Sequence, residues 1–328
     1  MDNLTHSLVG ALLGQAGLKR KTGLAMPALI IGANLPDVDA ACFFWLDGVE
    51  HLGFRRGITH GPPALVLLPL ILAGLLYGFD RWQVKRGKRP EGRLPVSFKW
   101  LFLLSFIGCL THPALDWLNV YGIRLLEPFS SQWFYGDTLF IIDVWLWALM
   151  GFAVWFSLRR EKRGGEWKRP ARIAMAVALG YIGVNGVITA YLSDFEQSQS
   201  YNMGKTIIVS PVPVNFFSRE VLIEAVPTIW SSTEWNGRLQ NVEAVNTACF
   251  GNCPGYPDAK VCSLAPARRL QDGNEQVRAF LFWSRAPFAE RAPDGSVILR
   301  DARYYDPRAR DRFSVALPDV KCVPLSAQ

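Results

Sequence analysis

The sequence predicts a mainly α-helical fold, in which a polytopic membrane domain with about six apolar helices precedes a smaller β-rich domain outside the cytoplasm. Half of the 328 residues are hydrophobic, and the mean hydropathy of +0.14 is high for a soluble protein. Apolar residues are concentrated in residues 1–192, whereas residues 193–204 are polar and residues 205–328 alternate strand-like stretches with turns. We therefore expect a membrane domain over 1–192, a linker over 193–204 and a β-rich domain over 205–328.

Apolar runs mark the expected membrane helices, at residues 4–18, 24–46, 62–79, 100–115, 139–158 and 173–192. Several runs are shorter than the roughly 20 residues that a spanning helix needs, so we expect some helices to be tilted, broken or re-entrant. The first run follows Asp2 and Asn3 and precedes its positive charges, which favours a retained helix over a cleaved signal peptide. Its small residues, among them Gly10 and Gly14, favour close helix packing.

Positive charge predicts the orientation. The formal net charge is +7, and much of the excess lies at residues 19–21, 81–99 and 159–172, each beside an apolar run. This is typical of cytoplasmic loops, so the charge needs no nucleic-acid partner. With these three segments inside, we expect a multi-pass protein of the bacterial inner membrane whose residues after Tyr191 lie outside the cytoplasm.

A polar segment, Asn34-Leu35-Pro36-Asp37-Val38-Asp39, interrupts the second apolar run. Carboxylates at membrane depth are costly unless a cation pairs with them. Pro36 is expected to break the helix, which lets Asp37 and Asp39 turn toward one cation. The plainer interpretation is a helix stop and cap.

Histidines supply the matching ligands. Three of the four follow a threonine, and His112 and Asp116 are four residues apart, on one face of a helix. A single histidine in an apolar helix is typically a packed, hydrogen-bonded residue. His51 is expected to lie at the surface. Acids and imidazoles at one membrane face together favour a metal site. Its expected ligands are His6, Asp37, Asp39, His60, His112 and Asp116.

Imidazole and carboxylate donors suit zinc, with manganese or iron as alternatives, in one or two ions. Such a site predicts hydrolysis of an ester or phosphoester of a membrane lipid or lipid-linked substrate by metal-activated water. Asp39 is expected to be essential, His6 to be a ligand or a base beside the metal, and Arg56 to hold the substrate phosphate. The alternative is a non-catalytic transport component or envelope scaffold with a structural metal or proton site. An intramembrane metalloprotease lacks support, because no His-Glu-x-x-His motif occurs.

The polar C-terminal part predicts strands at residues 206–210, 221–229, 237–245, 277–283 and 313–317, with turns at Asn236-Gly237, Asp272-Gly273 and Asp294-Gly295. Four cysteines in this part, Cys249, Cys253, Cys262 and Cys322, predict disulfides in an oxidising compartment. A zinc site that begins at Cys249 and Cys253 is the alternative. Cys42 and Cys109 lie in apolar runs and are expected to be packing residues.

The motifs together resemble the YdjM-like inner-membrane proteins, which are described as membrane-bound, metal-dependent hydrolases. The resemblance rests on Thr5-His6-Ser7, Asn34 to Asp39, Arg56-Gly57-Ile58-Thr59-His60 and Thr111-His112-x3-Asp116. It extends to the segment from Pro128 to Asp143, and it implies that Asp137 and Asp143 belong to the same polar cluster. The chain departs from the family pattern at Gly61, where a serine is usual.

Overall fold

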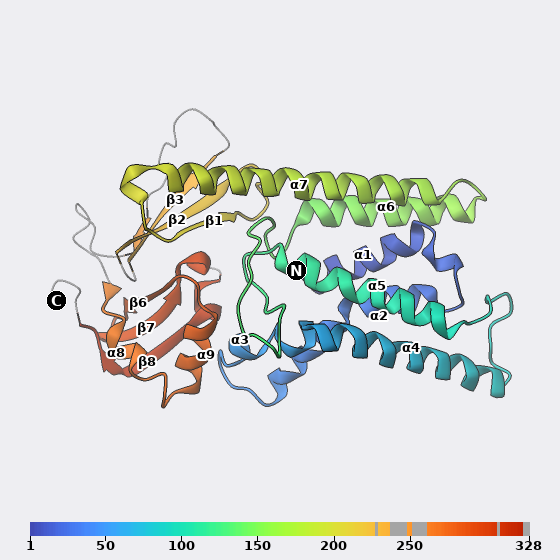
Figure 1. Cartoon of the computed structure of the whole chain (residues 1–328), viewed down its shortest axis with the longest axis horizontal. Coiled ribbons are helices and arrows are strands. Elements are labelled where there is room, and N and C mark those ends of the chain that lie inside the picture. Colours follow the sequence, from blue (N-terminus) through green and yellow to red (C-terminus); the bar gives the residue numbers. More distant parts are fainter. Residues whose placement is uncertain (227–228, 237–247, 251–260, 307–308, 324–328) are drawn as a thin grey trace. The chain divides into compact units, whose positions relative to one another are not determined.

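The structure is a computed structural model that describes residues 1–226, 229–236, 248–250, 261–306 and 309–323 (Figure 1). The chain forms two compact units. The first unit consists of residues 1–39 and 56–186, and the second consists of residues 40–55 and 187–328. Each unit is described here by itself.

The first unit is helical (Figure 1). Its helices are α1 (Asn3–Gln15), α2 (Ala25–Asn34), α4 (Pro62–Lys85), α5 (Phe98–Trp117), α6 (Val144–Lys162) and the first part of α7 (Lys168–Ser198). These helices occupy the six apolar runs. Among the described residues, four helical segments are long and apolar enough to cross a membrane: Ala25–Phe44, Pro62–Lys85, Phe98–Trp117 and Lys168–Ser198. Helix α1, with 13 residues, is shorter than the roughly 20 that a span requires.

Glycines bring three of these helices into close contact. A Cβ atom on Gly10 of α1 or on Gly108 of α5 would lie 2.7 or 2.6 Å from the backbone oxygen of Leu29 in α2. A Cβ atom on Gly32 of α2 would lie 2.7 Å from the backbone oxygen of Ser105 in α5. Helix α2 therefore packs backbone to backbone against α1 and α5, which is the small-residue packing that the first apolar run predicts.

Two helix ends differ from the sequence prediction. The run at 139–158 becomes helical only at Val144, because the side chain of Asp143 caps α6 by accepting hydrogen bonds from the backbone of Trp145 and Leu146. Helix α7 continues to Ser198, so the first half of the linker expected at 193–204 is helical. Near Pro36 the helix changes type, since the α-helix α2 ends at Asn34 and a 3-10 helix follows directly over Leu35–Phe44.

The second unit contains two antiparallel four-stranded sheets with strand orders β1-β2-β3-β4 and β5-β6-β7-β8. The first sheet comprises β1 (Ile207–Pro211), β2 (Arg219–Val226), β3 (Ile229–Trp235) and β4 (Ala248–Phe250). The second comprises β5 (Val261–Cys262), β6 (Pro287–Arg291), β7 (Ser296–Asp301) and β8 (Ser314–Lys321). The unit also contains the short helices α3 (His51–Phe54), α8 (Ala265–Arg268) and α9 (Glu275–Trp283).

The strand predicted at 277–283 is wrong, because this segment is helix α9. Asn274 caps the helix through its side chain, and the buried residues Val277, Phe280 and Trp283 recur every third position, as on one face of a helix. The predicted strands at 206–210, 221–229 and 313–317 overlap β1, β2 and β8. The strand expected at 237–245 lies outside the described residues.

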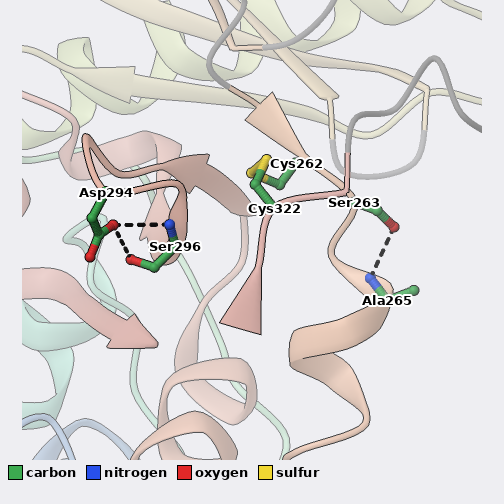
Figure 2. The surroundings of a disulfide bond; sticks show 6 residues. All are labelled: Cys262, Ser263, Ala265, Asp294, Ser296 and Cys322. Carbon is green, nitrogen blue, oxygen red and sulfur yellow. Dashed lines mark hydrogen bonds between the residues drawn. A yellow bond between two sulfur atoms is a disulfide. The ribbon is translucent and has the colours of Figure 1, made fainter. Parts of the chain in front are cut away.

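A disulfide joins Cys262 of β5 to Cys322, just after β8 (Figure 2). Beside it, Asp294 and Gly295 form the predicted turn between β6 and β7, where Gly295 has a φ of +82° and Asp294 accepts hydrogen bonds from the amide and hydroxyl of Ser296. Cys253 and the side chain of Cys249 lie outside what the structure describes, so the zinc alternative stays untested. Cys42 and Cys109 are both buried.

Candidate metal centre

Three histidines and two aspartates from four segments of the first unit converge on one place. Helix α1 carries His6, and a 3-10 helix over Ile58–His60 carries His60. Helix α5 carries His112 and Asp116, while Asp37 follows the end of α2. His6, His60, His112 and Asp116 are each 0% exposed to solvent. The close packing of α1, α2 and α5 is what brings these segments together.

The ligand atoms form two overlapping groups. The first contains His6, His112 and Asp116, and the second contains Asp37, His60 and His112. Within each group the ligand atoms lie within 4.8 Å of one another. His112 belongs to both groups, which makes its imidazole the centre of the arrangement.

The backbone fixes the orientation of His112. Its Nδ1 atom lies 2.7 Å from the carbonyl oxygen of Ala33, and a carbonyl oxygen can only accept, so Nδ1 carries the proton. The lone pair is therefore on Nε2, which lies 3.5 Å from Oδ2 of Asp116 and 3.7 Å from Oδ1 of Asp37. A histidine prepared in this way is typical of metal ligands.

A threonine performs the same task for His60. The hydroxyl of Thr59 donates to Oδ2 of Asp39 at 3.1 Å, so its oxygen accepts a hydrogen bond from Nδ1 of His60 at 2.9 Å. The proton of His60 is thus placed on Nδ1, and the Nε2 lone pair points to Oδ2 of Asp116, 3.6 Å away. The threonine that precedes this histidine orients it.

His6 is held by stacking. Its ring lies on that of His112, with 3.8 Å between centroids and 18° between planes. Its Nε2 atom is 3.4 Å from Oδ1 of Asp116. Within the described part of the chain, neither ring nitrogen of His6 has a hydrogen-bond partner.

Positive charge surrounds Asp116. The amino group of Met1 contacts its Oδ1 atom, and Nε of Arg56 lies 3.1 Å from Oδ2. Arg56 has a left-handed backbone, with a φ of 56°, and its amide donates to Oδ2 of Asp39 at 2.8 Å. Its Nη1 atom donates to Oδ1 of Asn119 at 3.0 Å and to the carbonyl of Gly122 at 3.1 Å. In this geometry the Nε and Nη1 atoms of Arg56 hold Asp116, Asn119 and Gly122, and its predicted contact with a substrate phosphate stays a prediction.

The donors fit a divalent cation. Nε2 of His6, His60 and His112 is buried and, among the described residues, has no hydrogen-bond partner. A buried polar atom without a partner costs free energy, of the order of 1–3 kcal/mol. A cation at the centre would satisfy all three nitrogens.

Comparisons with known proteins identify the family of this chain. Residues 1–192, more than half of the chain, match the YdjM inner membrane protein family. The chain belongs to this family. It is also 27% identical over 294 residues to the uncharacterized protein YfhP of Bacillus subtilis (strain 168), a match that covers 87% of this chain and 80% of the relative. No solved structure matches the chain significantly.

The YdjM family assignment and the four apolar helices make this chain a multi-pass protein of the inner membrane. All five residues of the candidate metal centre lie within the matched residues. The motifs that carry the resemblance to the YdjM family therefore supply every member of both ligand groups.

Other residues that the YdjM resemblance implies lie elsewhere. Asp143 caps α6 and accepts a hydrogen bond from the hydroxyl of Tyr181 at 2.8 Å, and Asp137 is buried with a left-handed backbone. Within the described chain, neither aspartate belongs to the ligand groups, and Asp39 lies behind His60 rather than in them. Sequence analysis missed Asn119, which accepts from both Arg56 and the amide of Tyr121. Its position three residues after Asp116, at the end of α5, was the available signal.

Proposed function

We propose that this chain is a metal-dependent hydrolase that cleaves an ester or phosphoester of a membrane-associated substrate. The observation that carries the proposal is the convergence of three buried Nε2 atoms on the carboxylate of Asp116. Two of these histidines have their protons fixed on the opposite nitrogen, at Ala33 and at Thr59. Histidines held in this way are typical of metal ligands, whereas buried Nε2 atoms without a partner cost stability in a purely structural core.

The donor set suits zinc best, with manganese or iron as alternatives, because imidazole nitrogen and carboxylate oxygen are both present. A bound divalent ion would supply Lewis acidity and a water-derived nucleophile near neutral pH. The single Nε2 atom of His112 is shared by both ligand groups, and one nitrogen binds one ion at a time. The described donors therefore support one ion more directly than two.

The residues around the proposed ligands pair with Asp116 and hold Asp39 in place. Arg56 and the amino group of Met1 contact Asp116, while Thr59 and the amide of Arg56 hold Asp39 in place behind His60. Since His6, His60, His112 and Asp116 are each 0% exposed and Asp37 is only partly buried, electrostatic interactions among these side chains are stronger than at a surface.

We further propose that the second unit lies outside the cytoplasm. The basic segments at 19–21, 81–99 and 159–172 favour an inner location for the loops that contain them. The disulfide between Cys262 and Cys322 supports the same orientation, because disulfides persist in oxidising compartments.

A hydrolysis assay tests the proposed activity. The full chain, purified in detergent and loaded with zinc, would be given 4-nitrophenyl phosphate and phosphatidic acid in mixed micelles. We expect turnover that His112→Ala abolishes and His51→Ala preserves, because His51 lies in α3 and outside both ligand groups. No turnover of either compound, or equal turnover in both variants, would contradict the proposal for these substrates.

A further inference from the structure

An apolar pocket of about 290 Å³ lies between helices α1, α5, α6 and α7 in the first unit. Apart from Thr5 and Thr111, every residue that lines it is apolar; Val9, Leu115, Leu146, Met150 and Ile182 are examples. The volume is at the lower end of the range of small-molecule pockets. Such a pocket selects an occupant without polar groups.

The two threonines present no free hydroxyl to this pocket. The hydroxyl of Thr5 donates to Oδ2 of Asp2 at 2.6 Å and accepts from Nε1 of Trp147 at 2.9 Å. The hydroxyl of Thr111 donates to the carbonyl of Gly108 at 2.6 Å. A polar occupant would lose its hydrogen bonds to water without replacement, whereas a hydrocarbon chain would lose nothing.

The pocket adjoins the ligand set. Thr5 directly precedes His6, Thr111 precedes His112, and Leu115 precedes Asp116. Consecutive helical residues have Cα atoms about 3.8 Å apart and point about 100° apart around the axis. The pocket and the first ligand group therefore lie on neighbouring flanks of the same two helices, α1 and α5.

The pocket also opens to the outer surface of the helices. Leu179, one of its lining residues, is 68% exposed, and Ala114, another, is also exposed. Both residues lie within helical segments long and apolar enough to cross a membrane. In a multi-pass membrane protein this surface faces lipid, so an alkyl chain enters sideways from the bilayer.

We propose that this pocket binds one alkyl chain of the substrate, which makes the substrate class a lipid with its scissile ester next to that chain. The inference rests on the proposed hydrolase function. A chain gains little by leaving the bilayer, because lipid is as apolar as the pocket. The pocket therefore acts mainly by orienting the ester toward the ligand set, and this raises the reaction rate.

Filling the pocket tests the proposal. Ala114→Phe places a large ring at the mouth of the pocket, and Leu110→Phe, one turn earlier on α5, is the matched control, since Leu110 is 40% exposed and does not line the pocket. With the zinc-loaded full chain, we expect Ala114→Phe to lower kcat/KM for phosphatidic acid by about tenfold or more and to leave that for 4-nitrophenyl phosphate within about twofold. An equal loss of kcat/KM for both substrates, or no loss for phosphatidic acid, would overturn the proposal that the pocket binds an alkyl chain.

A second measurement does not depend on turnover. Phosphatidic acid with a diazirine near the end of one acyl chain would be photo-crosslinked to the protein in nanodiscs, and the labelled peptides mapped. We expect labelling at Met150 and Met175 to exceed that at Leu75, a lipid-exposed residue of α4, and to fall in Ala114→Phe but not in Leu110→Phe.

The two measurements separate the proposals. Labelling of the pocket without hydrolysis would contradict the proposed activity and support the alkyl-chain site. If hydrolysis occurs but labelling at Met150 and Met175 is no greater than at Leu75, the alkyl-chain site is contradicted and the activity is supported. Labelling that Ala114→Phe leaves unchanged would have the same meaning.

Discussion

The Nδ1 atom of His112 lies 2.7 Å from the carbonyl oxygen of Ala33, and this hydrogen bond joins α5 to α2. It exists because the two helices approach each other at glycines. The same contact decides which nitrogen of His112 faces the carboxylates. Helix packing and ligand orientation are therefore one feature of this protein.

Gly108 tests this connection. Its Cβ atom would lie 2.6 Å from the carbonyl oxygen of Leu29 and 3.0 Å from the amide of Ala33, so Gly108→Ala must push α2 away from α5. We expect a lower melting temperature and weaker zinc binding, measured by thermal unfolding and by titration with zinc. Gly78→Ala in α4 is the control, since nothing lies within 4 Å of its Cβ position. There the change should be neutral or slightly stabilising. Equal behaviour of the two variants would contradict the packing argument.

The close approach of Glu127 explains why this chain has glycine at position 61, where the family usually has serine. A Cβ atom on Gly61 would lie 1.8 Å from the carbonyl oxygen of Glu127, a distance that no side chain tolerates. We expect Gly61→Ser to displace the segment around Glu127 and to destabilise the folded chain by a few kcal/mol, as over-packing does. Gly74→Ser, with open space at its Cβ position, serves as the comparison in thermal unfolding. If Gly61→Ser is as stable as Gly74→Ser, the segment around Glu127 can move without cost, and the contact does not explain the glycine.

Thr59 connects His60 to Asp39. Thr59→Val removes the hydroxyl that accepts from His60 and donates to Asp39, and Thr59→Ser keeps it. Loss of such a supporting partner typically weakens metal binding about 10–100-fold. We expect this for Thr59→Val in zinc titrations, with Thr59→Ser close to the natural chain. Wild-type affinity in Thr59→Val would show that the hydroxyl does not orient the imidazole.

We expect Asp39, like Thr59, to support the orientation of His60. The sequence alone predicts that Asp39→Asn abolishes hydrolysis, whereas its position behind His60 predicts a partial loss, because asparagine retains an oxygen that can accept from the amide of Arg56. Turnover measured beside that of His112→Ala separates the two expectations. Complete loss of turnover together with full metal occupancy would assign Asp39 a direct catalytic role.

Glu220 gives the second unit a pH dependence. Burial raises the pKa of Glu220 from 4.5 to about 7, and the hydroxyl of Ser232 donates to it at 2.7 Å. Because the folded state holds this proton more tightly than the unfolded state, the stability from this group is complete below pH 4.5 and is lost as the pH rises through about 7. We expect Glu220→Gln to reduce the fall in melting temperature between pH 5 and pH 8, which thermal unfolding would measure.

The control for this prediction is Glu275→Gln, at an exposed carboxylate of α9. It should leave the pH dependence unchanged. A Glu220→Gln profile parallel to that of the natural chain would show that Glu220 is not the group responsible.

Much of the helical unit follows from composition, because long apolar runs have few other stable structures. Helix ends follow less well, since the cap at Asp143 is one side chain within a run that reads as apolar throughout. The β-rich unit was harder to predict. Segment 277–283 has an apolar pattern that suits a strand as well as a helix, and only the cap at Asn274 favours the helix.

The convergence of His6, His60, His112, Asp37 and Asp116 could be predicted because acids and histidines are rare in apolar runs. The supporting contacts could not, since they depend on how the chain folds back. The sequence does not show that the backbone carbonyl of Ala33 contacts His112, nor that the side chain of Arg56 contacts Asp116 and Asn119.

Metal content tests the central claim most directly. Inductively coupled plasma mass spectrometry would be applied to the detergent-purified chain, prepared without chelator and with zinc, manganese and iron supplied. The natural chain and His51→Ala should each carry about one divalent ion, and His60→Ala/His112→Ala should carry almost none. A natural chain without metal, or a double variant with as much metal as the natural chain, would contradict the metal centre.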